Sequence, residues 1–271
     1  SVEPNDCKGN PGYTGEGTSV AACQPGTFKA LPLSAAGCSA CPSGTSSSEG
    51  AVAETDCSGN AGQTCVGSSV TPCSAGTYKA SSLSAAACVA CPANSGSPAG
   101  SDAEADCVAD AGFTGSGSSS SSSIEGCAAD TFKASGLSSA ACTSCPPNSG
   151  TGSATGSVSV SACTAKEGYS GPDGGPFQEC GAGAFKALQG SSPCSVCDEG
   201  KFKAAVAQTS GSSCETCPSN SGSPAGSNEE GDCLADAGFT GSGSSVVQCS
   251  AGTFKALPLS AAGCSACPSG T

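Results

Sequence analysis

The chain has 271 residues, 23 of them cysteine, and a net charge of −13 from 22 acidic residues and nine lysines. This acidity makes nucleic acid and anionic membrane surfaces poor partners, and no apolar run approaches the roughly 20 residues that cross a bilayer. Without Trp or Met, and with only eleven aromatic residues, the chain lacks the material for an ordinary core. We therefore expect disulfides to replace the core and the protein to be extracellular or on the cell surface.

The cysteine pattern restarts along the chain. The step is 50 residues from Cys7 to Cys57 and from Cys57 to Cys107, then 56 to Cys163 and 70 to Cys233. A period of this size predicts a linear array of small units, each touching mainly its neighbours, and hence an elongated rod. We expect five repeats: 1–56, 57–106, 107–162, 163–232 with an inserted half-repeat, and 233–271, which is truncated as if cut from a longer array.

Three motifs follow one another in each repeat. A Gly-aromatic-Thr/Ser-Gly box occurs at 12–15, 112–115, 168–171 and 238–241. A Cys-x-x-Gly-x-aromatic-Lys-Ala box, with Asp130 in place of Gly in one copy, starts at Cys23, Cys73, Cys127, Cys180, Cys197 and Cys249. A Cys-x-x-Cys pair starts at Cys38, Cys88, Cys142, Cys194, Cys214 and Cys264. Because Gly, Pro and Ser interrupt every ten residues, we predict small disulfide-rich tandem repeats of short β-ribbons and turns, with almost no helix.

Two metal sites are alternatives to a purely structural chain. Cys194, Cys197, Cys214 and Cys217 have zinc-ribbon spacing, but this spacing occurs once, and it ignores the box that Cys197 opens. The acidic runs before Cys57, Cys107 and Cys233 lack the alternating oxygens of a calcium loop, which favours solvated charge. We expect no metal and no cofactor, apart from covalent O-glycans.

The motifs Cys-x-x-Gly-Thr-Phe-Lys-Ala, Cys-x-x-Cys-Pro-x-Asn-Ser and Gly-Phe-Thr-Gly together resemble the ephrin-receptor-like cysteine-rich repeat. This repeat is similar to EGF-like and TNF-receptor-like modules and is abundant in extracellular proteins of algae and other protists. The family's longer form has two further cysteines. The first of these positions here holds Gly9, Gly59, Ala109, Ala165 or Ala235, and the second is also not cysteine.

The resemblance implies that the two absent cysteines are partners and that the others pair without them. The pairs are then Cys23–Cys38, Cys41–Cys57, Cys73–Cys88, Cys91–Cys107, Cys127–Cys142, Cys145–Cys163, Cys180–Cys194, Cys197–Cys214, Cys217–Cys233 and Cys249–Cys264. Cys7 and Cys267 would pair outside the chain, and Cys65 would be a free thiol or a cross-link to another chain. A competing scheme joins Cys7–Cys23 and Cys57–Cys73 and closes each Cys-x-x-Cys in a small strained ring.

Side chains at fixed places in the repeat suggest further roles. A lysine follows each box aromatic, at Lys29, Lys79, Lys133, Lys186, Lys203 and Lys255. We expect its stem to pack and its ammonium to face acids such as Asp56 or Asp106, with a lateral contact or cross-link as the alternative. O-glycans are predicted at Thr14, Thr114, Ser170, Thr240, Ser118, Ser119, Ser120, Ser121, Ser122 and Ser123, with unmodified turns and linkers as the alternative.

Catalysis is not expected, because the chain has no His to act as general base and its carboxylates lie on linkers. We predict a structural subunit of an extracellular filament or fibril, such as a surface hair or glycan-coated fibre, whose partners are glycans and other copies of itself. Residues 23–45 and 249–271 agree at 21 of 23 positions, and an array selected for length lengthens by such duplication. The alternative is the rigid stalk or ectodomain of an adhesion or receptor protein.

Overall fold

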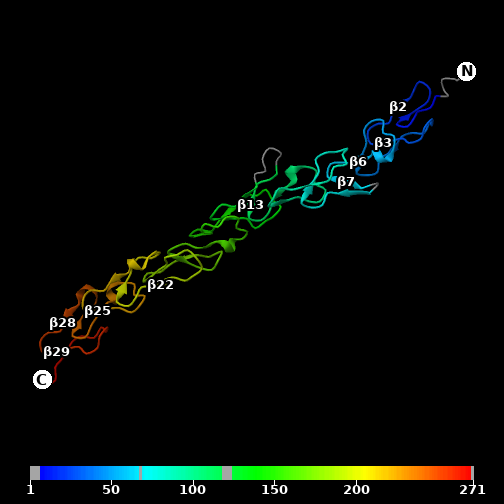
Figure 1. The fold of residues 1–271 in the computed structure, drawn as a ribbon. Coiled ribbons are helices and arrows are strands. Elements are labelled where there is room, and N and C mark those ends of the chain that lie inside the picture. Colours follow the sequence, from blue (N-terminus) through cyan, green and yellow to red (C-terminus); the bar gives the residue numbers. More distant parts are fainter. Residues whose placement is uncertain (1–6, 67–68, 118–123, 270–271) are drawn as a thin grey trace. The chain divides into compact units, whose positions relative to one another are not determined.

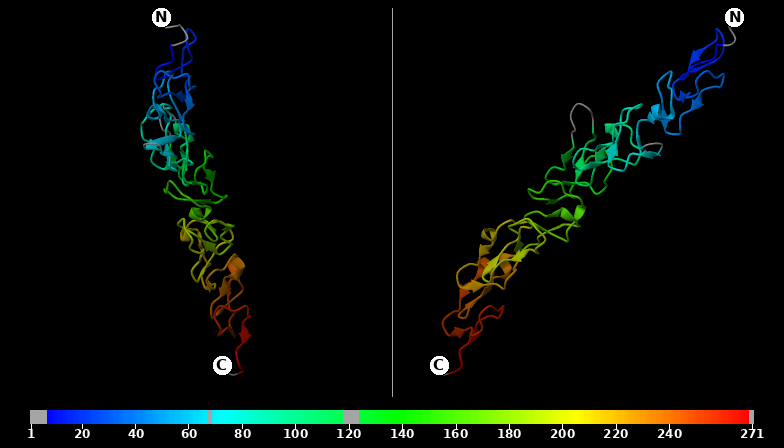
Figure 2. Two further views of the ribbon diagram at one scale, coloured as in Figure 1. Left: turned by 90° about the vertical axis from the view of Figure 1, so that its right-hand side faces the viewer. Right: turned by 45° about the vertical axis from the view of Figure 1, so that its right-hand side comes forward.

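The computed structural model describes residues 7–66, 69–117 and 124–269. The chain forms two compact units, one of residues 1–127 and 133–142 and the other of residues 128–132 and 143–271. Within each unit, small antiparallel ribbons follow one another in chain order (Figures 1 and 2). Every named strand in the described ranges pairs with one neighbour in sequence. The fold is therefore a succession of two-stranded ribbons.

The first ribbon of each repeat begins at the Gly-aromatic box, in which Gln63 replaces the aromatic residue in the second repeat. In the first repeat, Tyr13 lies opposite Ala22 and Thr14 opposite Ala21. The strand pairs of this kind are β1 (Tyr13–Thr14) with β2 (Ala21–Ala22), β7 (Gln63–Val66) with β8 (Ser69–Pro72), β13 (Phe113–Thr114) with β14 (Glu125–Gly126), β19 (Tyr169–Ser170) with β20 (Gln178–Glu179), and β27 (Phe239–Thr240) with β28 (Val247–Gln248).

The second ribbon follows the turn of the cysteine box. The Thr27 amide donates to the Gln24 carbonyl at 3.0 Å, and Gly26 has a φ of 81°, a conformation that favours glycine. The strand pairs are β3 (Thr27–Phe28) with β4 (Ser39–Ala40), β9 (Thr77–Tyr78) with β10 (Val89–Ala90), β15 (Thr131–Phe132) with β16 (Thr143–Ser144), β21 (Ala184–Phe185) with β22 (Ser195–Val196), β23 (Lys201–Phe202) with β24 (Glu215–Thr216), and β29 (Thr253–Phe254) with β30 (Ser265–Ala266).

The third ribbon begins after the Cys-x-x-Cys pair. Its turn places Asn94, Asn148 and Asn220 at φ values of 61–62°, which asparagine tolerates better than other side chains. The strand pairs are β5 (Thr45–Ser46) with β6 (Ser58–Gly59), β11 (Ser95–Gly96) with β12 (Val108–Ala109), β17 (Ser149–Gly150) with β18 (Thr164–Ala165), and β25 (Ser221–Gly222) with β26 (Leu234–Ala235).

Short 3₁₀ helices are the only helical elements in the described part of the chain. Five of them end directly before a disulfide-bonded cysteine: η2 (Glu54–Asp56), η3 (Glu104–Asp106), η4 (Val160–Ala162), η5 (Gly211–Ser213) and η6 (Glu230–Asp232). A sixth, η7 (Gly243–Ser245), precedes β28. None of these helices is long or apolar enough for a membrane span. The predicted fold class, disulfide-rich repeats of short ribbons with almost no helix, is confirmed.

The buried residues are cysteines, small side chains and lysines. Cys23, Cys107, Cys163 and Cys233 have no exposed surface, and Ala109, Ala165 and Ala235 are equally enclosed. The aromatic rings are covered only in part, and Tyr13 and Phe254 remain 46% exposed. Since so little apolar area leaves water, cross-links and polar contacts must hold each repeat.

Candidate functional site

Ten disulfides link the described cysteines, and they join the same ten pairs that the resemblance implied. Bonds such as Cys23–Cys38 close a cysteine box on itself, whereas bonds such as Cys41–Cys57 reach forward to the next repeat. The Cα atoms of all ten pairs lie 5.6–5.8 Å apart, within the range of unstrained disulfides.

The zinc alternative does not fit this bonding. Its four cysteines take part in three different disulfides, Cys180–Cys194, Cys197–Cys214 and Cys217–Cys233. Among the described residues, no three His, Cys, Asp or Glu side chains come together as a metal would require.

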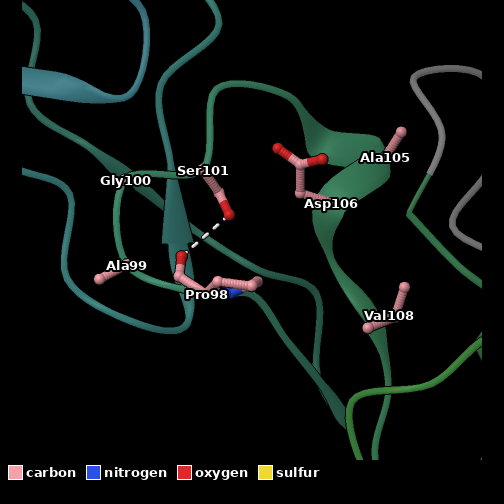
Figure 3. A pocket seen from close by; sticks show the side chains of 7 residues that line it. All are labelled: Pro98, Ala99, Gly100, Ser101, Ala105, Asp106 and Val108. Atoms are coloured by element: carbon pink, nitrogen blue, oxygen red, sulfur yellow. Dashed lines mark hydrogen bonds between the residues drawn. The ribbon is translucent and has the colours of Figure 1, made fainter.

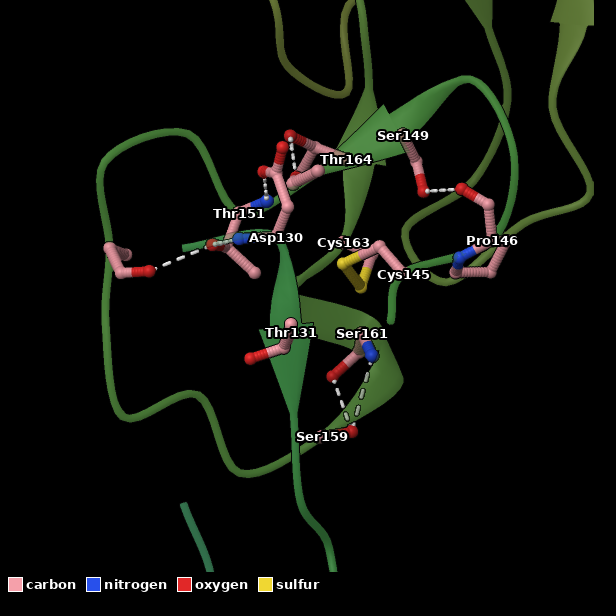
Figure 4. Close-up of a disulfide and its surroundings, with 12 residues drawn as sticks. Asp130, Thr131, Cys145, Pro146, Ser149, Thr151, Ser159, Ser161, Cys163 and Thr164 are labelled. Atoms are coloured by element: carbon pink, nitrogen blue, oxygen red, sulfur yellow. Dashed lines mark hydrogen bonds between the residues drawn. A yellow bond between two sulfur atoms is a disulfide. The ribbon is translucent and has the colours of Figure 1, made fainter. Parts of the chain in front are cut away.

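The forward bond Cys145–Cys163 shows how a repeat accommodates a changed turn (Figure 4). Asp130, in place of the usual glycine, has a φ of 64°, which aspartate tolerates. Its Oδ1 accepts the Thr151 amide at 2.9 Å, and its own amide donates to Thr151 Oγ1 at 2.8 Å. Lys166 Nζ lies 3.2 Å from the second carboxylate oxygen. The polar side chain thus ties the second ribbon to the third.

Three cysteines have no disulfide partner, and they are the three left over in the expected pairing. Cys7 and Cys267 are exposed, whereas Cys65 is half-buried. A Cβ atom on Gly59 would lie 3.2 Å from Cys65 Sγ. The thiol therefore lies beside the place where a buried alanine methyl, such as that of Ala109, stands in other repeats. A free thiol and a cross-link to another chain both stay open for Cys65.

Five of the six box lysines are buried, and their ammonium groups face carbonyl oxygens. This corrects the expectation that they face acids. Lys79 is 2% exposed, and its Nζ donates to the carbonyls of Gly59 (3.0 Å), Gln63 (2.8 Å) and Ser84 (2.7 Å). Equivalent bonds hold Lys29, Lys133, Lys186 and Lys255. An ammonium has three donors, so at Lys79 three carbonyls satisfy it completely.

Each of these lysine cages needs a small residue beside the ammonium. A Cβ on Gly9 would lie 3.2 Å from Lys29 Nζ, and a Cβ on Gly59 would lie 3.1 Å from Lys79 Nζ. The other cages have Ala109, Ala165 or Ala235 at this place. Side chains larger than alanine would compete with the ammonium for the same space.

The sixth box lysine, Lys203, has no carbonyl cage. Its Nζ lies 3.6 Å from Glu215 Oε1, and its side chain is 16% exposed. The Lys203 carbonyl accepts the Gly183 amide at 2.7 Å, as the Lys186 carbonyl accepts the Gly168 amide at 3.0 Å. Gly168 and Gly183 are therefore equivalent, and so are the residues three positions before them. That residue is Ala165 before Gly168 and the disulfide-bonded Cys180 before Gly183. The small residue is missing, and the ammonium turns to a carboxylate.

Burial lowers the pKa of the Lys186 ammonium below its ordinary value, because removing the charged form from water is unfavourable. The nearby carboxylates of Glu167 and Asp173 oppose this by raising the pKa. The carbonyl contacts thus hold a cation whose desolvation they offset only in part.

The acidic runs have a local role that goes beyond solvated charge. Asp106 Oδ2 accepts the amides of Asp102 (3.0 Å) and Ala103 (3.1 Å) ahead of η3, and Asp56 and Asp232 repeat this arrangement. Where the acid is missing, Ser159 Oγ accepts the Ser161 amide and Ser210 Oγ accepts the Ser212 amide instead. The last acid of each run therefore caps the turn that delivers the next cysteine.

A hollow in the first unit lies beside this cap. It measures about 450 Å³ and is lined by Pro98, Ser101, Asp106 and Val108 among others (Figure 3). Ser101 Oγ donates to the Pro98 carbonyl at 2.9 Å, and Asp106 is committed to its two amides. Ser101 Oγ and Asp106 Oδ2 are thus already used within the fold.

The predicted glycan acceptors lie in the first ribbons or outside the described residues. Thr14, Thr114, Ser170 and Thr240 are half-buried in β1, β13, β19 and β27. Thr14 Oγ1 donates to the Ala36 carbonyl at 3.2 Å, and Thr114 Oγ1 to the Ala140 carbonyl at 3.4 Å. The run from Ser118 to Ser123 lies outside the described residues. Glycosylation stays a prediction.

Sequence reasoning missed the lysine cages and the acid caps. A signal for the cages was present, because lysine recurs at one position in all six boxes while no acid lies at one fixed distance from all six lysines. No known family model matches the chain, and no curated protein matches its sequence. The chain is an array of small disulfide-rich repeats, the construction of an extracellular structural protein or ectodomain.

Proposed function

We propose that this chain is a non-catalytic structural part of an extracellular filament or fibril, assembled from ephrin-receptor-like repeats and carrying O-glycans. The observation that carries the proposal is that successive repeats use the same contacts. The forward disulfides join one repeat to the next at Cys41–Cys57, Cys91–Cys107, Cys145–Cys163 and Cys217–Cys233.

A second contact accompanies the forward disulfides. The loop after the box lysine reaches back to the third ribbon of the preceding repeat. A Cβ on Gly96 would lie 2.8 Å from Leu137 Cδ2, and a Cβ on Gly222 would lie 3.0 Å from Leu259 Cδ2. At the equivalent place, Gln189 Nε2 donates to the Gly150 carbonyl at 2.6 Å. Contacts that recur between neighbouring repeats suit a protein that forms a long array.

Immunogold electron microscopy on cells that carry the native protein tests the proposal. Antibodies against the chain should label surface filaments along their length, at intervals, because a structural subunit recurs throughout the fibre. Label confined to the plasma membrane with no filament would contradict the proposal and favour a receptor or adhesion stalk. Sugar analysis of the same material, after β-elimination, tests for the O-glycans.

A further inference from the structure

The loop after each of two caged lysines closes over the third ribbon of the preceding repeat. We call these loops lysine straps, and they comprise residues 133–138 and 255–260. The first strap contacts β11 and β12, and the second contacts β25 and β26. Each strap therefore touches both strands of its ribbon, with the ammonium on one strand and a leucine on the other.

The ammonium holds the first strap to the second strand of the ribbon. Lys133 Nζ donates to the Ala109 carbonyl of β12 at 3.1 Å and to the Ser138 carbonyl at the end of the strap at 2.6 Å. The Ser138 amide in turn donates to the Ala109 carbonyl at 3.2 Å. Because Lys133 is only 3% exposed, loss of the ammonium would leave buried carbonyl groups without this donor.

A leucine of the same strap lies on the first strand of the ribbon. Leu137, directly before Ser138, has a φ of 49°, which a bulky side chain rarely adopts. In this conformation Leu137 Cδ2 lies 2.8 Å from the point where Gly96 of β11 would carry a Cβ atom. Since the ammonium fixes the carbonyl that follows the leucine, the strained conformation persists. The ammonium and the leucine thus act on one ribbon through one short loop.

The second unit repeats this arrangement. Lys255 Nζ donates to the Ala235 carbonyl of β26 and to the Ser260 carbonyl, both at 2.8 Å. Leu259 has a φ of 47°, and its Cδ2 lies 3.0 Å from the point where Gly222 of β25 would carry a Cβ atom. The lysine, the carbonyls, the leucine and the glycine occupy the same places in both units, so the strap is a property of the repeat.

Two other lysine loops differ from the straps at one position each. After Lys186, Gly190 stands where the straps have leucine, and Gln189 Nε2 instead donates to the Gly150 carbonyl of β17 at 2.6 Å. Leu83 shares the positive φ, but the ribbon before it has Ser46 in place of the glycine. A complete strap therefore needs a caged lysine, a leucine at positive φ and a glycine in the preceding ribbon.

We propose that the lysine straps couple neighbouring repeats, so that loss of a caged lysine in one repeat loosens the third ribbon of the repeat before it through the strap leucine. The strap is a conformational device that acts backwards along the chain. In an array of repeats such a contact is an interaction between neighbours, which makes neighbouring repeats unfold together. The coupling would serve a filament and a receptor stalk equally, so it goes beyond the proposed function.

Amide hydrogen exchange of the oxidised chain, resolved by NMR, tests the second strap. The probe is the Asp236 amide, which donates to the Asn220 carbonyl at 2.9 Å at the end of the ribbon of β25 and β26. Leu259→Ala should speed its exchange about fivefold, because the leucine loses its packing on the ribbon. The matched control Leu257→Ala truncates a leucine of the same strap that is 66% exposed, and it should change the rate less than about twofold.

A double-mutant cycle tests the coupling itself. Lys255→Met keeps the buried stem but removes the ammonium, so it should speed Asp236 exchange at least about tenfold. If the ammonium holds the leucine in place, adding Leu259→Ala to Lys255→Met should change the rate less than about twofold further. Exchange of the Asp110 amide in the first unit, which donates to the Asn94 carbonyl at 3.0 Å, should stay unchanged and shows that each variant folds.

Three results would each overturn the strap. They are no effect of Leu259→Ala on Asp236 exchange, equal effects of Leu257→Ala and Leu259→Ala, and an undiminished effect of Leu259→Ala in the Lys255→Met background. The two leucine variants keep the ammonium in its cage, so they decide the contact on their own even where Lys255→Met does not fold.

Discussion

The cysteine boxes at Cys180 and Cys197 lie next to each other in one unit and share one motif, yet the ammonium groups of their lysines have different partners. Lys186 is 3% exposed, and its ammonium contacts the carbonyls of Ala165 and Gly190. Lys203 instead pairs with Glu215. The backbone bonds of the two boxes correspond, since the carbonyl of each lysine accepts a glycine amide upstream.

The difference arises at a single place, which holds Ala165 for one box and Cys180 for the other. Ala165 leaves room for an ammonium, whereas Cys180 fills the place with its disulfide to Cys194. Both boxes keep their own disulfide, Cys180–Cys194 or Cys197–Cys214, and only the Lys186 box adds a lysine cage to it. The comparison teaches that the cage depends on the small residue beside the ammonium, whereas the box disulfide does not.

Of the changes that test this comparison, loss of a disulfide should lower the free energy of unfolding most. The variants Cys180→Ser/Cys194→Ser and Cys197→Ser/Cys214→Ser open loops with sequence separations of 14 and 17, so each should lower the local free energy of unfolding by about 3 kcal/mol. Amide hydrogen exchange of the surrounding ribbons measures this. A loss below about 1 kcal/mol for both pairs would show that the small core holds the repeat without them.

Replacement of each lysine in turn should lower the free energy of unfolding by different amounts in the two boxes. Lys186→Met leaves buried carbonyls without a donor and should cost about 1–3 kcal/mol. Lys203→Met removes one partly exposed ion pair and should cost about 0–1 kcal/mol. The difference should be visible in exchange of the Gly168 and Gly190 amides, which bond to Lys186 and Ala165. Equal costs would remove the distinction between cage and ion pair.

The pH dependence should show a smaller effect of the Lys186 cage. Its pKa is lowered in the fold, so between that pKa and the ordinary lysine value of about 10.4 the unfolded chain binds more protons than the folded one. The free energy of unfolding should therefore rise with pH across this window. Alkylation of the free thiols prevents disulfide exchange during the titration. The rise should be absent in Lys186→Met, and a fall in its place would contradict the direction of the shift.

The ribbons and their class followed from the sequence because their causes are local. Turn residues such as Gly26 and Asn94 fix where the chain reverses, and the repeated spacing defines the units. The disulfide pairs followed from the resemblance and occur unchanged in the structure. That the free Cys65 lies beside Gly59 became apparent only from the structure. The elongated shape and the repeat boundaries stay predictions, which small-angle scattering tests for the shape.

The lysine cages could not be read from the chain because their parts lie far apart in it. The Lys79 ammonium collects the Gly59 carbonyl from 20 residues upstream and the Ser84 carbonyl from 5 residues downstream. Backbone carbonyls carry no signature in the sequence, so only the recurring lysine marked the site. The acid caps were missed for a related reason. A carboxylate that accepts hydrogen bonds from amides a few residues earlier resembles a solvated charge when only its sequence neighbours are known.

A disulfide map of the native, unreduced protein tests the central claim most directly. Digestion that cleaves between the two cysteines of each Cys-x-x-Cys, followed by mass spectrometry, distinguishes the bonding schemes. The account predicts peptides joined as Cys38 to Cys23 and Cys41 to Cys57, with equivalent links in every repeat. Cys38 bonded to Cys41, together with a Cys57–Cys73 link, would contradict it and remove the bridges that join one repeat to the next.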